Sequence, residues 1–234
     1  MRVLFVQQDH VSPPGPVGEA FADHGYDVAE FGVVPSGRFH DPSVTVSFPD
    51  PLSYDAIVPM GAAWSVYDRD RIGTWIDDEL GFLRRAHDAG VPVLGICFGA
   101  QALATAPGRP GHQGRTARGG VDPDRDEPAR PDRAGAMVPV AFRPLGPAGR
   151  HPRAGQDRDR RAGLHRGAQP GRPVHPELTP QMLDGWLSNG GRQQPRAFGL
   201  DPDQLTAETA ARSGEARLRA KRLVSAFLAL AGSA

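Results

Sequence analysis

Short apolar runs, separated by polar and glycine-containing segments, recur through the first hundred residues of the chain. Val3–Val6 is an unbroken apolar run, which is typical of a strand buried on both faces of a sheet. Asp27–Phe31, Tyr54–Pro59 and Val91–Ile96 predict three more strands. The segments between these runs are long enough for the crossover connections that parallel strands require.

Helical patterns lie between and after these strands. Pro16–His24 predicts a helix that ends at Gly25. Arg71–Ala89 predicts a longer helix with one buried stripe, whose apolar positions are Ile72, Trp75, Ile76, Leu80, Leu83 and Ala86. A short helix, Ala100–Thr105, follows the last strand. The alternation predicts an α/β fold, a doubly wound and mostly parallel sheet flanked by helices, with the active site at the carboxyl ends of the strands.

The C-terminal part of the chain has a different organisation. Pro202–Ala231 predicts a helical segment, and its candidate core positions are Leu218, Leu223, Phe227 and Leu230. We therefore expect one domain over residues 1–190 and a helical C-terminal extension over residues 191–234. This extension either packs on the domain or forms a homodimer, and the sequence leaves both alternatives open.

A break in composition falls inside the domain. Residues 107–173 hold fourteen arginines, twelve glycines and eleven prolines, but only seven residues from Val, Leu, Met and Phe. Seven acidic residues oppose the fourteen arginines there, whereas the whole chain is neutral. Such a segment buries too little apolar surface to offset its ordering entropy. Taken as written, it predicts a disordered insertion.

Composition of the whole chain limits the class of protein. A length of 234 residues is enough for one sizeable α/β domain, and the zero net charge gives no global attraction to nucleic acid or membrane. The single cysteine forms no internal disulfide, which fits a reducing compartment. The N-terminal apolar run is too short for a signal peptide, and no later segment approaches a membrane span. We expect a soluble, cytoplasmic protein.

The most informative motif is the turn Gly95-Ile96-Cys97-Phe98-Gly99-Ala100-Gln101. It places the cysteine between a buried strand and a helix, where the helix dipole and unpaired backbone N–H groups favour a thiolate. The flanking glycines permit a sharp backbone turn, as in the Gly-x-Ser-x-Gly elbow of hydrolases. A structural buried cysteine is the competing interpretation, and the strand-turn-helix setting favours a nucleophile.

A cysteine nucleophile needs a base, and the base needs a group that orients it. His175-Pro176-Glu177 supplies an imidazole and a carboxylate joined by a residue of fixed φ. The nearest rival is His10 beside Asp9, which we interpret as a polar loop after the first strand. The candidate catalytic residues are therefore Cys97, His175 and Glu177.

Together, the cysteine turn and His175-Pro176-Glu177 resemble the signature pair of class I glutamine amidotransferases. The loop from Met60 to Asp68 is similar to the oxyanion loop of the branch that includes the amidotransferase domain of GMP synthase. That loop usually reads Gly-Gly-Pro, and here it reads Gly-Ala-Ala. This sequence difference matters little, because backbone N–H groups hold the oxyanion and alanine has such a group. The resemblance covers residues 1–106 and about 173–190.

This resemblance implies a definite chemistry. Cys97 attacks the side-chain amide of glutamine, His175 transfers the proton, and Glu177 orients the ring. Backbone N–H groups near Gly61 or Ala62 and of Phe98 hold the oxyanion, and Gln101 contacts the bound glutamine. Ammonia leaves, and water releases glutamate from the thioester. The resemblance implies no metal or organic cofactor, and it implies a synthetase partner that accepts the ammonia.

The arginine-rich segment also has a second interpretation, that residues 107–173 are encoded out of frame. Reading the codons one base later gives tryptophan across Met137-Val138 whatever the unknown bases are. From Ala136 to Gly146 the shifted reading permits PWFQWHFDRW, which resembles an aromatic strand of the same amidotransferase branch. From Ala162 to Val174 it permits a Gln-Ala-Phe run, which chains of this family commonly carry before His-Pro-Glu.

Three alternatives to an amidotransferase stay open. A hydrolase on the same architecture would cleave γ-glutamyl or peptide bonds without passing ammonia on. A frameshifted relative with unassembled catalytic groups would be inactive. A non-catalytic protein would bind nucleic acid through the arginine-rich segment, but that segment mixes in acidic residues and prolines and has Phe142 as its lone aromatic residue.

Overall fold

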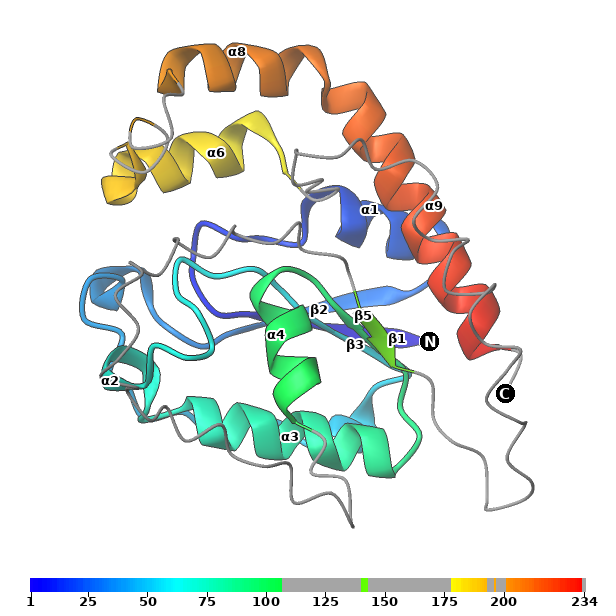
Figure 1. Ribbon diagram of the computed structural model, residues 1–234. Coiled ribbons are helices and arrows are strands. Elements are labelled where there is room, and N and C mark those ends of the chain that lie inside the picture. The colour runs from blue at the N-terminus through cyan, green and yellow to red at the C-terminus, as the bar shows by residue number, and fades with distance from the viewer. Residues whose placement is uncertain (107–139, 143–177, 193–195, 197–200, 233–234) are drawn as a thin grey trace, which may run out of the picture.

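The computed structural model describes residues 1–106, 140–142, 178–192, 196 and 201–232 (Figure 1). The strands are β1 (Arg2–Gln7), β2 (Asp27–Gly32), β3 (Ala56–Pro59), β4 (Val93–Gly95) and β5 (Val140–Phe142). The helices are α1 (Gly15–Asp23), α2 (Arg69–Ile72), α3 (Ile76–Asp88), α4 (Phe98–Thr105), α6 (Pro180–Trp186), α8 (Pro202–Ala211) and α9 (Ser213–Ala231). The alternation predicted for the first hundred residues is confirmed.

The strands form one sheet in the order β2-β1-β3-β4-β5. The first four strands are parallel, and β5 pairs antiparallel with β4, Val93 lying opposite Phe142. From β1 the chain goes first to β2 on one side and then to β3 on the other side, so the order of strands reverses at β1. A doubly wound sheet has its binding crevice outside the carboxyl ends of the strands at such a position, here the ends of β1 and β3.

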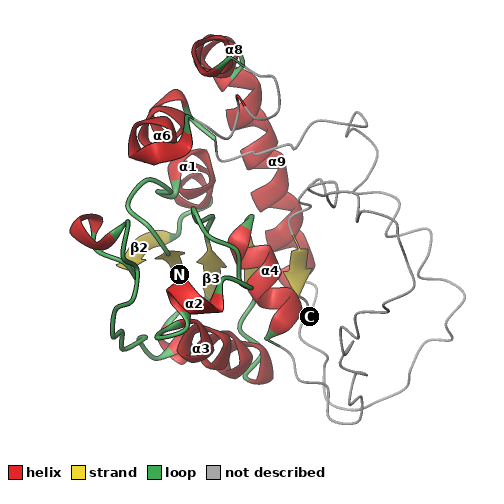
Figure 2. Cartoon of the chain, turned by 60° about the vertical axis from the view of Figure 1, so that its left-hand side comes forward, coloured by secondary structure: helices red, strands yellow, loops and turns green. Residues whose placement is uncertain are grey.

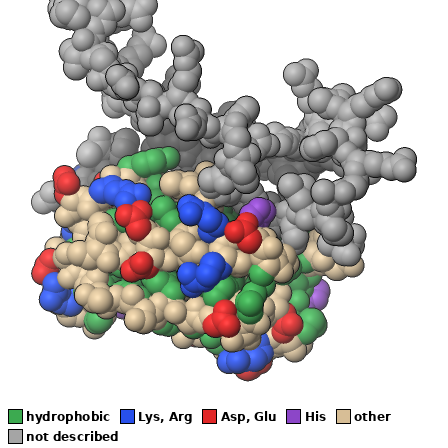
Figure 3. All heavy atoms as spheres, turned by 90° about the horizontal axis from the view of Figure 1, so that it is seen from below, with side chains coloured by type: hydrophobic (Ala, Val, Ile, Leu, Met, Phe, Trp, Pro, Cys, Tyr) green, Lys and Arg blue, Asp and Glu red, His purple; other side chains and the backbone are tan. Residues whose placement is uncertain are grey.

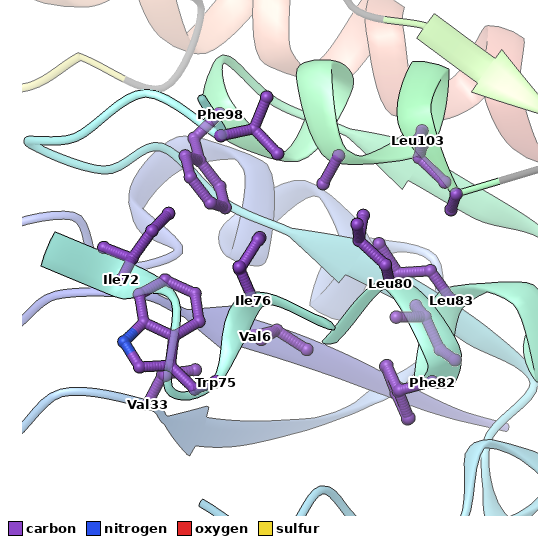
Figure 4. Close-up of a cluster of buried hydrophobic side chains, with 14 of the residues drawn as sticks. Val6, Val33, Ile72, Trp75, Ile76, Leu80, Phe82, Leu83, Phe98 and Leu103 are labelled. Carbon is purple, nitrogen blue, oxygen red and sulfur yellow. The ribbon is translucent and has the colours of Figure 1, made fainter. Parts of the chain in front are cut away.

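Each face of the sheet has its own apolar core, because successive strand residues point to opposite faces. Val3 and Phe5 face α1 and α9, whereas Leu4 and Val6 face α3 and α4. Figure 2 shows the resulting layers, with α1 and α9 on one side of the sheet and α3 on the other. In Figure 4, Phe98 and Leu103 from α4 point toward side chains of α3 and the segment before it.

Two helices, α2 and α3, occupy the range in which the sequence predicted one helix. All six predicted core residues of that range are buried, so the stripe is confirmed. The helix itself is interrupted between Ile72 and Ile76, where Trp75 adopts a non-helical φ of −136°. Trp75 is fully buried and its indole Nε1 donates to the carbonyl of Pro42 at 2.9 Å. This tertiary contact explains the break, which local spacing does not reveal.

The helical segment predicted over Pro202–Ala231 is confirmed, and it consists of two helices, α8 and α9, which meet at a bend at Arg212 (Figure 1). Helix α9 lies along α1, with Lys221 2.8 Å from Asp23 and Phe227 buried near Phe21. Of the predicted core positions, Phe227 is buried and Leu223 is partly buried. Leu218 and Leu230 are about half exposed, so these two predicted core positions are wrong.

Strand β5 belongs to the arginine-rich segment, residues 107–173, in which the sequence predicted an irregular chain. Its three residues, Val140, Ala141 and Phe142, extend the sheet beyond β4. Valine and phenylalanine favour strands, and an edge position requires pairing on one side alone.

Helix length and surface charge indicate whether a membrane or a polyanion could bind the described part of the chain. No helix in the described part of the chain is long and apolar enough to cross a membrane. On the face that carries α3, basic and acidic side chains are interspersed wherever the structure describes them (Figure 3). This part of the surface therefore offers no single-sign patch for a polyanion.

Candidate active site

Cys97 lies between β4 and α4 in a strained backbone conformation. Its φ is 54° and its ψ is −111°, and it is the one non-glycine residue in the described ranges with a positive φ. These angles belong to a region that glycine dominates, and other residues there cost about 1–3 kcal/mol. The Cys97 side chain is half-buried at the N-terminus of α4. Glycine would adopt this conformation without strain. The presence of a cysteine instead indicates that its side chain has a function.

Gly95 and Gly99 make this turn sterically possible. A Cβ on Gly99 would lie 2.0 Å from the carbonyl oxygen of Pro59, and one on Gly95 would lie 2.7 Å from the carbonyl oxygen of Gly99. The Gly99 N–H donates to the carbonyl of Met60 at 2.9 Å. The close packing predicted for these two glycines is therefore present, and it joins α4 directly to the end of β3.

Gly99→Ala is expected to destabilise the fold by about 3 kcal/mol or more, because the added methyl overlaps a backbone oxygen that cannot move independently. Gly81→Ala is the matched control, since a Cβ on Gly81 in α3 meets no atom within 4 Å. That control should stabilise the protein by about 0.5–1 kcal/mol through helix propensity. Urea unfolding measures both, and equal effects would contradict this account of the turn.

The loop after β3, residues 60–68, passes directly beside the cysteine, and we call it the oxyanion loop after the role that the resemblance implies for it. A Cβ on Gly61 would lie 3.4 Å from Cys97 Cβ and 3.6 Å from Cys97 Sγ. Ala62 is partly buried against the core. Phe98 directs its ring into the core near Trp75, with ring centroids 6.0 Å apart (Figure 4). The structure thus brings Gly61, Ala62 and Phe98 into the immediate surroundings of Cys97.

Gln101 holds the far part of the oxyanion loop. Its Oε1 accepts a hydrogen bond from the Val66 N–H at 3.1 Å and another from Ser65 Oγ at 3.3 Å. A side chain one turn after the nucleophile therefore connects α4 to this loop. The resemblance implied a contact between Gln101 and glutamine; the described contacts give it a further role in fixing loop shape.

Asp9 contacts the oxyanion loop, a position that the sequence interpretation missed. It follows β1 and is 1% exposed, and its Oδ2 accepts from the Ala63 N–H at 2.8 Å while its Oδ1 accepts from the Val11 N–H at 3.1 Å. Burial raises the pKa of Asp9, whereas hydrogen bonds from Ser12, Ala63 and Val11 oppose that rise. The available signal was a carboxylate placed directly after the central buried strand.

Gln8, which precedes Asp9, forms a second buried polar contact, with Glu79 of α3. Both are fully buried, and Gln8 Nε2 donates to Glu79 Oε1 at 2.6 Å. The remaining oxygens, Gln8 Oε1 and Glu79 Oε2, have no hydrogen-bond partner among the described residues. Burial raises the pKa of Glu79 to about 8, which the hydrogen bond from Gln8 partly offsets. Glu79 is therefore held as the neutral acid at neutral pH.

Glu79→Gln is expected to flatten the pH dependence of stability. The folded pKa near 8 exceeds the ordinary value of 4.5, so the contribution of the group is complete below 4.5 and is lost as the pH rises to 8. The loss is on the order of a few kcal/mol. Since glutamine mimics the neutral acid, the variant should exceed the wild type near pH 8 and match it more closely near pH 5.

Urea unfolding at several pH values between 5 and 8 tests this prediction. Asp78→Asn serves as the control, because it removes an exposed carboxylate from the same helix, and it should keep the wild-type slope. A parallel decline of Glu79→Gln and wild type over this range would show that Glu79 is not the cause.

The predicted base and its orienting group, His175 and Glu177, lie outside the described residues. The described chain resumes at Leu178, and Thr179 caps α6 by accepting from the Met182 N–H at 3.1 Å. Helix α6 lies against the loop after β1, because Trp186 Nε1 donates to Ser12 Oγ at 3.3 Å. The segment that follows Glu177 is therefore anchored to the loop that carries Asp9.

Within the described ranges, no group of three or more His, Cys, Asp or Glu side chains could hold a metal ion. The described groups around Cys97 are the N-terminus of α4, the backbone of the oxyanion loop and the buried Asp9 that binds this loop.

Comparison with known proteins agrees with this site. Residues 48–144 match the family model of "Glutamine amidotransferase class-I". The GMP synthase [glutamine-hydrolyzing] of Listeria welshimeri is 36% identical over 78 residues, which cover 33% of this chain and 13% of that protein. The chain thus matches a small part of the length of this curated relative. The family match contains the oxyanion loop and Cys97 and ends before His175.

Two solved structures are similar in part. A glutamine amidotransferase from Methylobacillus flagellatus is 26% identical with a TM-score of 0.34, covering 45% of this chain and 38% of that one. One from Thermotoga maritima is 14% identical with a TM-score of 0.49, covering 99% and 96%. The likeness to class I glutamine amidotransferases therefore rests on the sequence matches, and the family match covers residues 48–144 of the chain.

Proposed function

We propose that the protein hydrolyses the side-chain amide of glutamine and that Cys97 is the nucleophile. The observation that carries this proposal is the position of Cys97 in a strained elbow, with Gly61 of the oxyanion loop so close that a Cβ added there would lie 3.6 Å from its sulfur. A nucleophile and backbone N–H donors placed on the same side of a sheet are the minimum that acyl transfer requires.

The reaction takes place in two steps. The Cys97 thiolate attacks the amide carbon of glutamine, and N–H groups of Gly61 or Ala62 and of Phe98 stabilise the oxyanion. His175 donates a proton to the leaving nitrogen, so that ammonia leaves and a γ-glutamyl thioester remains. Water, deprotonated by His175, then attacks the thioester, which releases glutamate and restores the thiol. Glu177 orients the imidazole throughout.

Chain topology supports the assignment of His175 and Glu177. Leu178 follows Glu177 directly, and α6 is anchored through Trp186 and Ser12 to the loop after β1. That loop also binds Ala63 of the oxyanion loop through Asp9. In this proposal the anchored segment that begins at Leu178 follows the two catalytic groups directly in the chain.

The ammonia acceptor belongs to a partner in this proposal. The similar protein from Listeria welshimeri is a GMP synthase that hydrolyses glutamine, and by analogy we assign to the present chain a synthetase partner that consumes ammonia. The sequence has no phosphate-binding loop of the Gly-x-x-x-x-Gly-Lys type. Activation of the acceptor is therefore assigned to the partner.

The proposal is tested by measuring ammonia and glutamate release by the purified chain. Glutamine should yield both products in equal amounts, at a rate well above that for γ-glutamyl conjugates or peptides. Faster cleavage of a γ-glutamyl conjugate would identify a hydrolase on the same architecture. Product release at equal rates with and without the protein would contradict the proposed function.

A further inference from the structure

We propose that Asp9 and Ser12 are positioning residues that couple the oxyanion loop to helix α6. The connection from Asp9 to Ser12 contacts the oxyanion loop on one side and α6 on the other. Its effect on catalysis rests on the proposed function, whereas the coupling between the two elements does not.

The contact with the oxyanion loop is made by Asp9. Its carboxylate is almost fully buried and accepts the Ala63 N–H at 2.8 Å. Ala63 follows the residues whose N–H groups are proposed to hold the oxyanion. A buried carboxylate that accepts a backbone N–H fixes that peptide strongly, because loss of the contact would leave a buried polar group unpaired.

The contact with α6 is made by Ser12 and Val11. Ser12 is 1% exposed and accepts from Trp186 Nε1 at 3.3 Å, and the Ser12 side chain lowers the pKa of Asp9 against the effect of burial. Beside it, Gly185 approaches so closely that a Cβ there would lie 3.1 Å from Val11 Cγ1. The result is a series of contacts from Trp186 through the short Asp9–Ser12 segment to the Ala63 backbone.

This series joins two parts of the site that are distant in sequence. The oxyanion loop follows β3, whereas α6 follows the segment with His175 and Glu177. Catalytic groups must hold their relative positions to within about 0.5 Å, so a shared rigid connection benefits both parts. The buried hydroxyl at Ser12 is explained by this arrangement, since a purely apolar core would not require it.

Amide hydrogen exchange of ¹⁵N-labelled full-length protein tests the coupling without any reference to activity. Asp9→Asn, Ser12→Ala and Trp186→Phe should each accelerate exchange at the Ala63 amide, about tenfold for Asp9→Asn and severalfold for the other two. Ser12→Thr, which keeps the hydroxyl, should restore protection. Ser225→Ala removes a hydroxyl that binds His24 far from the site and should leave Ala63 unchanged.

Two exchange results would overturn the proposal: no change at Ala63 in Ser12→Ala and Trp186→Phe, or an equal change in Ser225→Ala. A wild-type chain without glutaminase activity would refute the proposed function, and the exchange data would still decide the coupling. Where turnover is present, Ser12→Ala should lower kcat with little change in KM, because the oxyanion forms only in the transition state. A rise in KM at constant kcat would contradict the positioning role.

Discussion

Cys97→Ala is expected to lower ammonia release from glutamine by at least about 10⁴-fold, because removal of a nucleophile leaves only the contribution of binding and the oxyanion site. The substitution removes the sulfur while the oxyanion loop keeps its hydrogen bonds to Asp9 and Gln101. Steady-state rates at saturating glutamine measure the effect. Retention of more than a few per cent of the activity would exclude Cys97 as the nucleophile.

The backbone strain at Cys97 provides a matched control for this experiment. Cys97→Gly should be equally inactive, but it should be more stable than Cys97→Ala by about 1–3 kcal/mol, because glycine accepts a φ of 54° and a ψ of −111° without strain. Thermal or urea unfolding of the two variants measures the difference. Equal stability would show that the elbow stores no strain and would weaken the functional interpretation of its geometry.

Restoring the shifted reading frame over residues 107–173 is expected to raise glutaminase activity by several orders of magnitude. As written, this segment separates Cys97 from His175 with very few apolar residues. The shifted frame permits apolar and aromatic strand sequences in the same places. Because a displacement of 1 Å between catalytic groups already costs about 100-fold, recovery of the missing apolar sequence should have a large effect.

Sequencing the gene across this segment and assaying both chains checks the prediction. The gene should contain compensating shifts near both ends of the segment, with the original phase regained before His175. Equal activity of the two chains would contradict the frame hypothesis and would favour a natural insertion. Cys97→Ala in the restored chain is the control, and it should abolish whatever activity is gained.

The fold of the first hundred residues was largely predictable from sequence, because buried parallel strands and a one-sided helix leave strong patterns. Val3–Val6 and the apolar stripe that includes Ile76 and Leu83 are examples. The elbow at Cys97 was predictable for a related reason, since glycines at positions 95 and 99 are residues that a crowded turn requires.

Other features depend on contacts between distant residues, which local patterns do not contain. The break before α3 arises from the hydrogen bond between Trp75 and Pro42, 33 residues away. Asp9 was read as part of a polar loop because its partner, Ala63, is 54 residues away. Glu79 is buried against Gln8, 71 residues away, which the apolar spacing of its helix does not indicate. In each case a tertiary contact decides the role.

In the proposed mechanism Cys97 carries the γ-glutamyl group during hydrolysis of glutamine. The most direct test is to quench the protein in acid during turnover of isotopically labelled glutamine and to locate the label by peptide mass mapping. The account predicts a thioester-linked γ-glutamyl group on the peptide that contains Cys97, and its absence from Cys97→Ala. Label on another residue, or steady ammonia release without any label on Cys97, would contradict the account.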